Sequence, residues 1–267
     1  MLVAAEQGNY AKIRWLMSRG VSTEHLSSFG MTPLMRAATL GHTKVCEALV
    51  EGGADVNAVS FSGFTTLHFA ARQGNDHLVK VLVEAGADID KVTGDGSTAL
   101  ALAAREGHPH IVAFLLGAGA NTELRDSRLN ATPLIVAIIN QNPDSVYTLV
   151  QGGADPTAVS NLDMRPLHYA AWPMNEASIN ILMDAGADVD TSDMFGNTPL
   201  AIAAMTGNGA AVDVLLYRGA NPAIRNNEGL SPLDQLCRCL GNYENAPCDV
   251  EKCDDQESIR AKFDSLL

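Results

Sequence analysis

The sequence predicts an all-α solenoid, in which helix-turn-helix units are joined by β-hairpin-like turns. One observation is a leucine after a short Thr-Pro-like turn, which recurs every 33 or 34 residues along the 267-residue chain. Another is a glycine before a small residue, which recurs with the same period. Self-similarity at such a period is typical of a repeat architecture. The leucines are Leu34, Leu67, Leu100, Leu134, Leu167, Leu200 and Leu233, and the glycines are Gly20, Gly53, Gly86, Gly119, Gly153, Gly186 and Gly219.

Both series slip by one residue in the same part of the chain. The interval is 34 residues from Leu100 to Leu134 and again from Gly119 to Gly153, and it is 33 elsewhere. One residue is therefore inserted within segment 121–131.

Each unit begins with a short helix whose start can be recognised in the sequence. A hydroxyl residue caps the first turn of a helix, and proline is favoured at its first position. Small residues such as Ala70 and Ala71 let neighbouring helices approach closely, and Gly74 then ends the helix. The cap and proline occur together at Thr32-Pro33, Thr132-Pro133, Thr198-Pro199 and Ser231-Pro232.

A second helix and a polar turn complete the unit. Ile111, Phe114 and Leu115 have the i, i+3, i+4 spacing of an amphipathic helix, which Gly119 ends. The polar stretch that follows, for instance 55–63, suits a turn that reaches the next unit.

With this repeated pattern, the sequence resembles the ankyrin repeat family. Segment 63–74, GFTTLHFAARQG, and segment 82–88, LVEAGAD, are close to the family pattern, which recurs along the whole chain. The resemblance implies a single ankyrin-repeat domain over residues 1–267. Its first repeat lacks a turn, and its last carries an insertion at about 241–256. The eight expected repeats are approximately 1–29, 30–62, 63–95, 96–129, 130–162, 163–195, 196–228 and 229–267.

Composition and charge restrict the class of partner. The formal net charge is −13, which opposes binding to nucleic acid or to an anionic membrane. No apolar run has the length of a membrane-spanning helix, and the N-terminus lacks a signal sequence. The five cysteines are too few and too clustered to crosslink the chain, which favours a reducing compartment. We expect a monomer in the cytoplasm, with the nucleus as the alternative location.

The sequence offers no constellation for catalysis, so we expect neither an enzyme nor a cofactor. The loop 94–98 has the glycines of a phosphate-binding loop but lacks its lysine. His108 and His110 have no third ligand nearby in the sequence. In the ankyrin family, the histidines at the positions of His68 and His168 are structural.

The C-terminal cysteines are the strongest candidate for a metal site. Cys237, Cys239, Cys248 and Cys253 provide four thiols, the ligand set of a structural zinc. Their CxC and Cx4C spacings differ from the usual CxxC, so we predict no metal. Zinc and a disulfide remain the alternatives to free thiols.

Asn57 is a candidate for modification. Its context, LVEGGADVN at 49–57, resembles the repeat turns that asparaginyl hydroxylases modify. Hydroxylation is therefore a family-based expectation for this residue.

The ankyrin resemblance implies a concave groove, lined by the first helices and the turns, that binds other proteins. We predict that side chains two and five residues after each leucine face this groove. Tyr169 and Trp172 form an aromatic pair typical of interface hot spots. Packing between repeats is the alternative role. These positions are Arg36, Phe69, Leu102, Val136, Tyr169 and Ile202, followed by Arg72, Arg105, Ile139, Trp172 and Met205.

Apolar residues also occupy the tips of the turns, where a soluble stack would carry polar ones. We predict that they bind the partner, unless they fold back on adjacent turns. Arg36, Arg72 and Arg105 form a basic line that would attract a peptide of acidic and apolar character, unless they are merely solvated. The tip residues are Phe29, Phe61, Leu129, Leu162 and Phe195.

The sequence therefore predicts a non-catalytic module that binds a peptide or protein segment of a partner. The alternative is a targeting or regulatory ankyrin domain of a larger enzyme, ubiquitin-ligase adaptor or channel.

Overall fold

The computed structural model describes residues 1–172, 175–236, 259–261 and 263. Over these residues the regular elements are all helices, and no strand is formed. The predicted all-α class is therefore confirmed. The chain divides into two compact units, Met1–Arg128 (unit 1) and Leu129–Leu267 (unit 2), which we describe separately.

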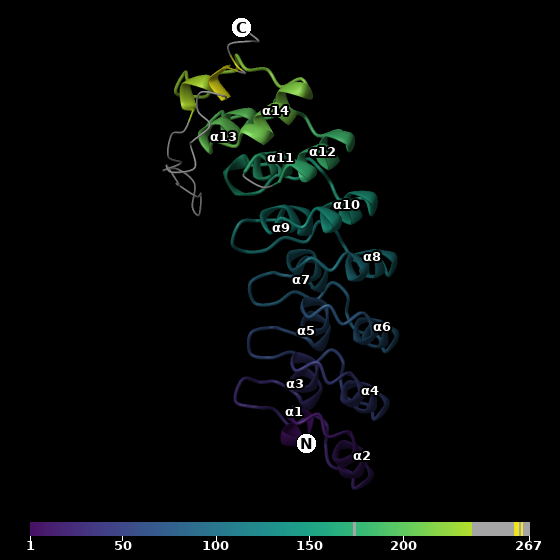
Figure 1. Ribbon diagram of the computed structural model, residues 1–267. Coiled ribbons are helices and arrows are strands. Elements are labelled where there is room, and N and C mark those ends of the chain that lie inside the picture. The colour runs from purple at the N-terminus through teal and green to yellow at the C-terminus, as the bar shows by residue number, and fades with distance from the viewer. Residues whose placement is uncertain (173–174, 237–258, 262, 264–267) are drawn as a thin grey trace. The chain divides into compact units, whose positions relative to one another are not determined.

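Unit 1 is built from pairs of antiparallel helices (Figure 1). The first helix of each pair, the inner helix, contacts the inner helix of the next pair. The second, the outer helix, contacts the next outer helix in the same way. The inner helices are α1 (Leu2–Glu6), α3 (Pro33–Thr39), α5 (Thr66–Arg72) and α7 (Ala99–Glu106), and the outer helices are α2 (Tyr10–Ser18), α4 (Thr43–Glu51), α6 (Asp76–Glu84) and α8 (Pro109–Gly117).

Unit 2 repeats this arrangement. Its inner helices contact one another in sequence, as do its outer helices. Two short 3-10 helices, η1 (Asn161–Asp163) and η2 (Leu233–Gln235), precede α11 and follow α14. The inner helices are α9 (Pro133–Ile139), α11 (Pro166–Ala170) and α13 (Pro199–Met205), and the outer helices are α10 (Pro143–Gln151), α12 (Glu176–Asp184) and α14 (Gly209–Tyr217).

The predicted helix starts are confirmed by their caps. Thr32 Oγ1 accepts a hydrogen bond from the Met35 N–H at 3.2 Å, and Thr198 Oγ1 accepts one from the Ala201 N–H at 3.3 Å. Each bond satisfies an amide that lacks a partner within its helix. The prolines at 33, 133 and 199 occupy the first helical position.

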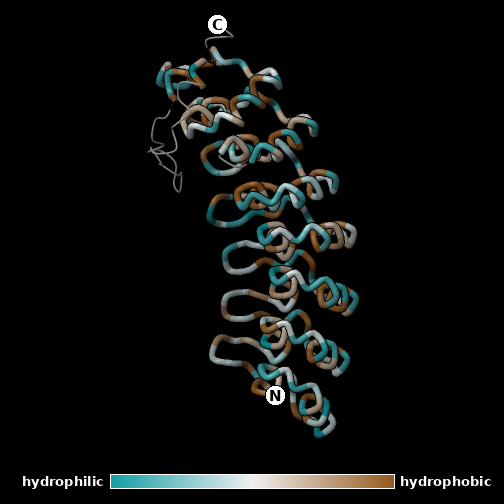
Figure 2. Tube along the Cα trace, in the orientation of Figure 1, coloured by the Kyte–Doolittle hydropathy of each residue, from teal (hydrophilic) through white to brown (hydrophobic). Residues whose placement is uncertain are grey.

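The core of each unit lies between the stacked helices. Marker leucines such as Leu67 and Leu134 are fully buried, and so are Ala70 and Ala71. The helices carry both hydrophobic and hydrophilic segments, as expected for elements with one buried face (Figure 2). Alanine at the contacts between inner helices keeps these short helices close together.

Hairpin-like turns, which we call fingers, connect the pairs and project from the helices (Figure 1). In most fingers the N–H of one residue donates to the carbonyl four residues later, as Ser27 does to Met31 at 2.9 Å and Ser160 to Met164 at 2.8 Å. This bond closes the turn without forming a strand. The fingers closed in this way are 27–31, 60–64 and 93–97 in unit 1 and 160–164, 193–197 and 226–230 in unit 2.

Backbone hydrogen bonds also join the tips of consecutive fingers within a unit. The Phe61 N–H donates to the Phe29 carbonyl at 3.2 Å, and the next residue, Ser62, accepts from the Gly94 N–H at 2.9 Å. In unit 2, Met194 donates to Leu162 at 2.9 Å and Asn227 donates to Phe195 at 3.0 Å. Each bond spans 32 residues, so the fingers form a regular ladder.

The ladder identifies the inserted residue. In a regular finger, the residue that donates to the preceding finger is followed at once by the residue that accepts from the next. In the finger at 126–131, Ser127 donates to the Asp95 carbonyl at 2.8 Å, whereas Leu129 accepts from the Asn161 N–H at 2.9 Å. Arg128, between them, is therefore the extra residue. The division between the two units falls directly after it.

Most finger tips contain a glycine with positive φ. Gly63 has φ of 78°, and a Cβ atom there would lie only 2.8 Å from the Gly94 nitrogen in the next finger. Glycine is thus required both by conformation and by close approach. The finger 160–164 of unit 2 departs from this rule, because Leu162 and Asp163 adopt φ of 63° and 53° there, whereas Gly196 and Gly229 follow it.

Candidate functional site

The side chains two residues after each leucine are mostly buried. Phe69, Leu102, Tyr169 and Ile202 are 7%, 2%, 3% and 0% exposed, so the prediction that they project into a groove is wrong. Their alternative role, packing between repeats, describes them correctly. Arg36 and Val136 are half-buried.

This burial results from the direction that the position faces. Arg36 reaches back to helix α1, where its Nη2 lies 2.7 Å from Glu6 Oε1. Tyr169 reaches the preceding finger, with its Oη 2.8 Å from Ser160 Oγ. The position therefore faces the neighbouring repeat, and an apolar side chain there is part of the core.

The side chains five residues after each leucine remain partly accessible. In unit 2, the Trp172 ring packs edge-on against Tyr169, with their centroids 5.6 Å apart. One member of this aromatic pair is therefore buried, whereas the other is half-exposed. The half-buried residues at this position are Arg72 and Arg105 in unit 1 and Ile139, Trp172 and Met205 in unit 2.

The three arginines of the predicted basic line differ in their partners. Arg36 pairs with Glu6, and Arg105 Nε lies 3.2 Å from Glu106 Oε1. The Arg72 guanidinium instead lies over the rings of Phe64 and Phe69, 5.7 and 5.6 Å from their centroids. In the part of the chain that the structure describes, no carboxylate lies within ion-pair distance of Arg72.

The finger tips of the two units also differ. Phe29 and Phe61 in unit 1 are 71% and 77% exposed, whereas Leu129, Leu162 and Phe195 in unit 2 are half-buried. Unit 1 also has a second exposed row that was not predicted from the sequence, formed by Leu26, Val59 and Val92 at 55%, 46% and 43% exposure. These residues are spaced 33 apart, so the period of the chain was the signal that could have revealed them.

The histidines after the marker leucines are structural, as the family resemblance implied. His68 Nδ1 accepts from the Thr65 N–H at 3.0 Å, and its Nε2 lies 3.2 Å from the Ser97 carbonyl of the next repeat. His168 makes the same pair of bonds, from the Arg165 N–H at 3.0 Å and to the Asn197 carbonyl at 3.1 Å. Burial lowers the pKa of His68, and it lowers the pKa of His168 to about 4. Both rings are neutral links between neighbouring repeats.

The Asn57 side chain also links neighbouring repeats. Its amide donates to the Gly86 carbonyl at 3.0 Å, and its Oδ1 accepts from the Asp88 N–H at 2.7 Å. Hydroxylation of Asn57 stays a prediction.

Metal and phosphate sites find little support. No group of three or more His, Cys, Asp or Glu side chains in the described ranges could hold a metal ion. Cys237, Cys239, Cys248, Cys253 and the expected insertion at 241–256 lie outside the described residues. The glycine-rich loop 94–98 belongs to a finger, and its Gly94 amide already bonds to Ser62.

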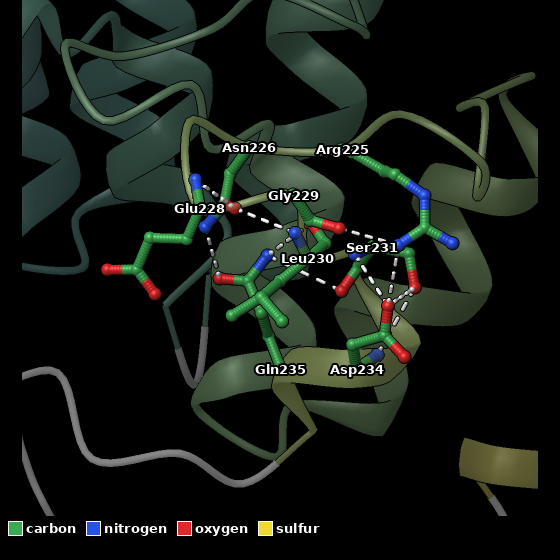
Figure 3. A network of polar contacts seen from close by, with 8 residues as sticks. All are labelled: Arg225, Asn226, Glu228, Gly229, Leu230, Ser231, Asp234 and Gln235. Atoms are coloured by element: carbon green, nitrogen blue, oxygen red, sulfur yellow. Dashed lines mark hydrogen bonds and ion pairs between the residues drawn. The ribbon is translucent and has the colours of Figure 1, made fainter.

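Polar contacts fix the last described finger (Figure 3). Asp234 Oδ2 accepts from the Ser231 N–H at 2.9 Å and lies 3.2 Å from Arg225 Nη1, and the Ser231 amide bond holds the pKa of Asp234 below its usual value. Arg225 also donates to the Gly229 carbonyl at 2.6 Å. At Ser231-Pro232 the helix starts one residue later than predicted, because Pro232 is the N-cap of η2, although Ser231 Oγ still accepts from the Asp234 N–H at 3.3 Å.

These features define a protein of stacked helix pairs whose fingers and inner helices present partly exposed side chains. The protein-family model described as ankyrin repeats (3 copies) matches residues 1–93, 67–160, 101–193 and 167–247. The chain therefore belongs to the ankyrin repeat family, whose members are typically non-catalytic modules for protein–protein interaction. No helix in the described part of the chain is long and apolar enough to span a membrane.

Solved structures of ankyrin repeat domains are similar to this chain. The domain of human ASB11 shares 26% sequence identity with a TM-score of 0.74, covering 87% of this chain and 98% of that one. The domain of Bcl-3, described as a unique member of the IkappaB protein family, shares 26% identity with a TM-score of 0.70, covering 80% and 96%. A comparison with curated protein sequences gives no match.

Proposed function

We propose that this protein is a non-catalytic interaction module that binds a peptide or protein segment of a partner through its fingers and inner helices. The family supports binding to proteins in general. The observation that supports this surface in particular is the exposure of large apolar side chains on the fingers of unit 1. Exposed apolar clusters of this kind mark interaction surfaces.

The surface differs from the one that the sequence suggested. The buried Phe69, Leu102, Tyr169 and Ile202 would support it from beneath. Direct contact with the partner would come from the five half-buried inner-helix residues, Arg72, Arg105, Ile139, Trp172 and Met205, and from the finger tips. Arg36 and Val136 complete the proposed set.

Affinity capture from a lysate of the source cell tests the proposal. The intact chain is compared with one variant in unit 1, Phe29→Ser with Phe61→Ser, and one in unit 2, Ile139→Ser with Met205→Ser. A control variant, Tyr147→Ser with Tyr217→Ser, changes exposed aromatic residues on the outer helices α10 and α14. We expect a protein that the intact chain and the control retain and that at least one surface variant loses. Equal capture by all four proteins would contradict the proposed surface.

A second candidate is a targeting or regulatory domain of a larger enzyme, ubiquitin-ligase adaptor or channel. Its support is that both solved neighbours are described as the ankyrin repeat domains of their proteins. An immunoblot of the native protein from the source cell tests this candidate. A band much larger than the 28.2 kDa of this chain supports it, and a band of that size contradicts it.

A further inference from the structure

Unit 1 carries an apolar surface on its fingers, which we call the finger patch: Leu26, Phe29, Val59, Phe61 and Val92. All five side chains are exposed, and they lie on three successive fingers that the backbone ladder joins. The Phe61 ring lies directly over Gly30, since a Cβ atom there would be 2.5 Å from the ring. The patch therefore extends continuously from the first finger to the second.

The finger patch is also uncharged over its first two fingers. The sequence contains no charged residue from Leu26 to Met31, nor from Ala58 to Phe64. In unit 2 the positions that correspond to Leu26 are the half-buried Val159, followed by Ser192 and Arg225. Large apolar residues exposed without charges between them are the expected lining of a surface that excludes water on binding.

Arg72 provides an open positive charge beside the first two fingers of this patch, in addition to the exposed Lys91 next to Val92 on the third. Its guanidinium group lies over the ring of Phe64, in the same finger as Phe61, and over the ring of Phe69, and these rings hold it in place. Its neighbours in the basic line, Arg36 and Arg105, are each paired with a glutamate. A guanidinium group held by aromatic rings is suited to a carboxylate, with which it forms two parallel hydrogen bonds.

Net charge limits how acidic the partner can be. The chain carries a formal net charge of −13, which would repel a strongly acidic segment at long range. One carboxylate beside bulky apolar residues fits both the open charge of Arg72 and the uncharged fingers.

We propose that unit 1 binds an extended segment of a partner protein whose bulky apolar side chains cover the finger patch and whose one carboxylate pairs with Arg72. This inference rests on the function proposed above and specifies the chemistry of the partner.

Selection from a library of random linear peptides displayed on phage, with the full chain as bait, tests the inference. We expect the selected peptides to combine bulky apolar residues with one Asp or Glu. A parallel selection on the Arg72→Glu variant is expected to replace that acid with Lys or Arg, because reversing the charge reverses the preference. The Phe29→Ser, Phe61→Ser variant should bind the selected peptides about tenfold more weakly or worse.

Two controls separate a lost contact from a lost fold. Lys12→Glu reverses a charge on the exposed face of α2, and Tyr217→Ser removes an exposed aromatic residue from α14. Both variants should retain the selected peptides, and all variants should unfold at the temperature of the intact chain. Selected peptides that lack an acid, an Arg72→Glu variant with an unchanged preference, or a selection that enriches no peptide would each overturn the inference. A protein captured from lysate in spite of such a result would leave the proposed function standing.

Discussion

The Tyr169 hydroxyl lies 2.8 Å from Ser160 Oγ and so joins inner helix α11 to the finger that precedes it. Ser160 Oγ also lies 2.9 Å from the Met164 carbonyl. Because a serine hydroxyl has one hydrogen, Ser160 donates to that carbonyl and Tyr169 donates to Ser160. The tyrosine therefore stabilises the finger from within the core.

Removing this hydroxyl should destabilise the protein. Tyr169→Phe keeps the ring and deletes one buried hydrogen bond, so we expect the free energy of unfolding to fall by about 1 kcal/mol. Chemical denaturation measures the change. Tyr147→Phe, at an exposed position on α10, is the matched control and should have no effect. Equal stability of the two variants would show that the bond contributes nothing.

Asn57 should contribute to stability through the repeat that follows it. Asn57→Ala removes the bonds to the Gly86 carbonyl and the Asp88 N–H, and we expect a loss of about 1 kcal/mol. Thr157 is the control, because it occupies the corresponding turn of unit 2 and its hydroxyl donates to Asp155 within that turn, at 2.7 Å. If Thr157→Ala lowers the melting temperature as much as Asn57→Ala does, the link between repeats is not what stabilises the turn.

Two glycines with similar backbone angles allow the energetic cost of a positive φ to be distinguished from the cost of a steric clash with the next finger. Gly53 and Gly63 have φ of 81° and 78°, but a Cβ atom at Gly53 would meet nothing within 4 Å. Gly53→Ala should therefore lower the free energy of unfolding only by the cost of placing alanine at a positive φ, about 1 kcal/mol. Gly63→Ala should cost clearly more, because its Cβ would collide with the backbone of the next finger. Melting temperatures of the two variants test this order, and the reverse order would contradict the ladder.

The buried His168 should make stability fall in mild acid. Its pKa is about 4 in the folded protein and 6.5 in the unfolded chain, so between these values the unfolded chain binds more protons. The contribution of neutral His168 to the free energy of unfolding is therefore fully present well above pH 6.5. It decreases as the pH falls towards 4, by up to about 2 kcal/mol at pH 5. The measurement is unfolding at pH 7.5 and 5.0, in parallel with His168→Gln. The variant should lose part of this dependence, whereas the exposed His25→Gln should keep all of it.

Cys46 should be unreactive in the folded protein. Burial raises the pKa of its thiol to about 12, and the reactive species is the thiolate. We expect N-ethylmaleimide at pH 8 to leave the Cys46 peptide unmodified until denaturant is added, as read by mass spectrometry of the digested protein. Rapid modification without denaturant would mean that the core around α4 opens readily.

The repeat period predicted the fold, because each repeat uses the same local signals. Thr32, Pro33 and Leu34 specify a helix start that does not depend on the rest of the chain. The inserted residue was confined to a segment by spacing, but only the hydrogen bonds of Ser127 and Leu129 identify it as Arg128.

The direction of side chains could not be deduced in the same way. The seven-residue helix α5 has contacts on several sides, so its periodicity does not show that Phe69 is covered while Arg72 is accessible. Burial there depends on the neighbouring repeat. The exposure of Val59 and Val92 likewise depends on the orientation of the backbone that leads into each finger.

Most hydrogen bonds between repeats join residues about one period apart, such as 29 residues for Asn57 and Gly86 and 38 for Arg218 and Asn180. Contacts of such short sequence separation can form soon after their own segment is synthesised, since little chain must be closed into a loop. Within each unit, folding can therefore proceed one repeat at a time. When the protein is pulled by its two ends, we expect each unit to unfold in steps of one repeat. A domain whose terminal segments are paired with each other would instead unfold in a single step.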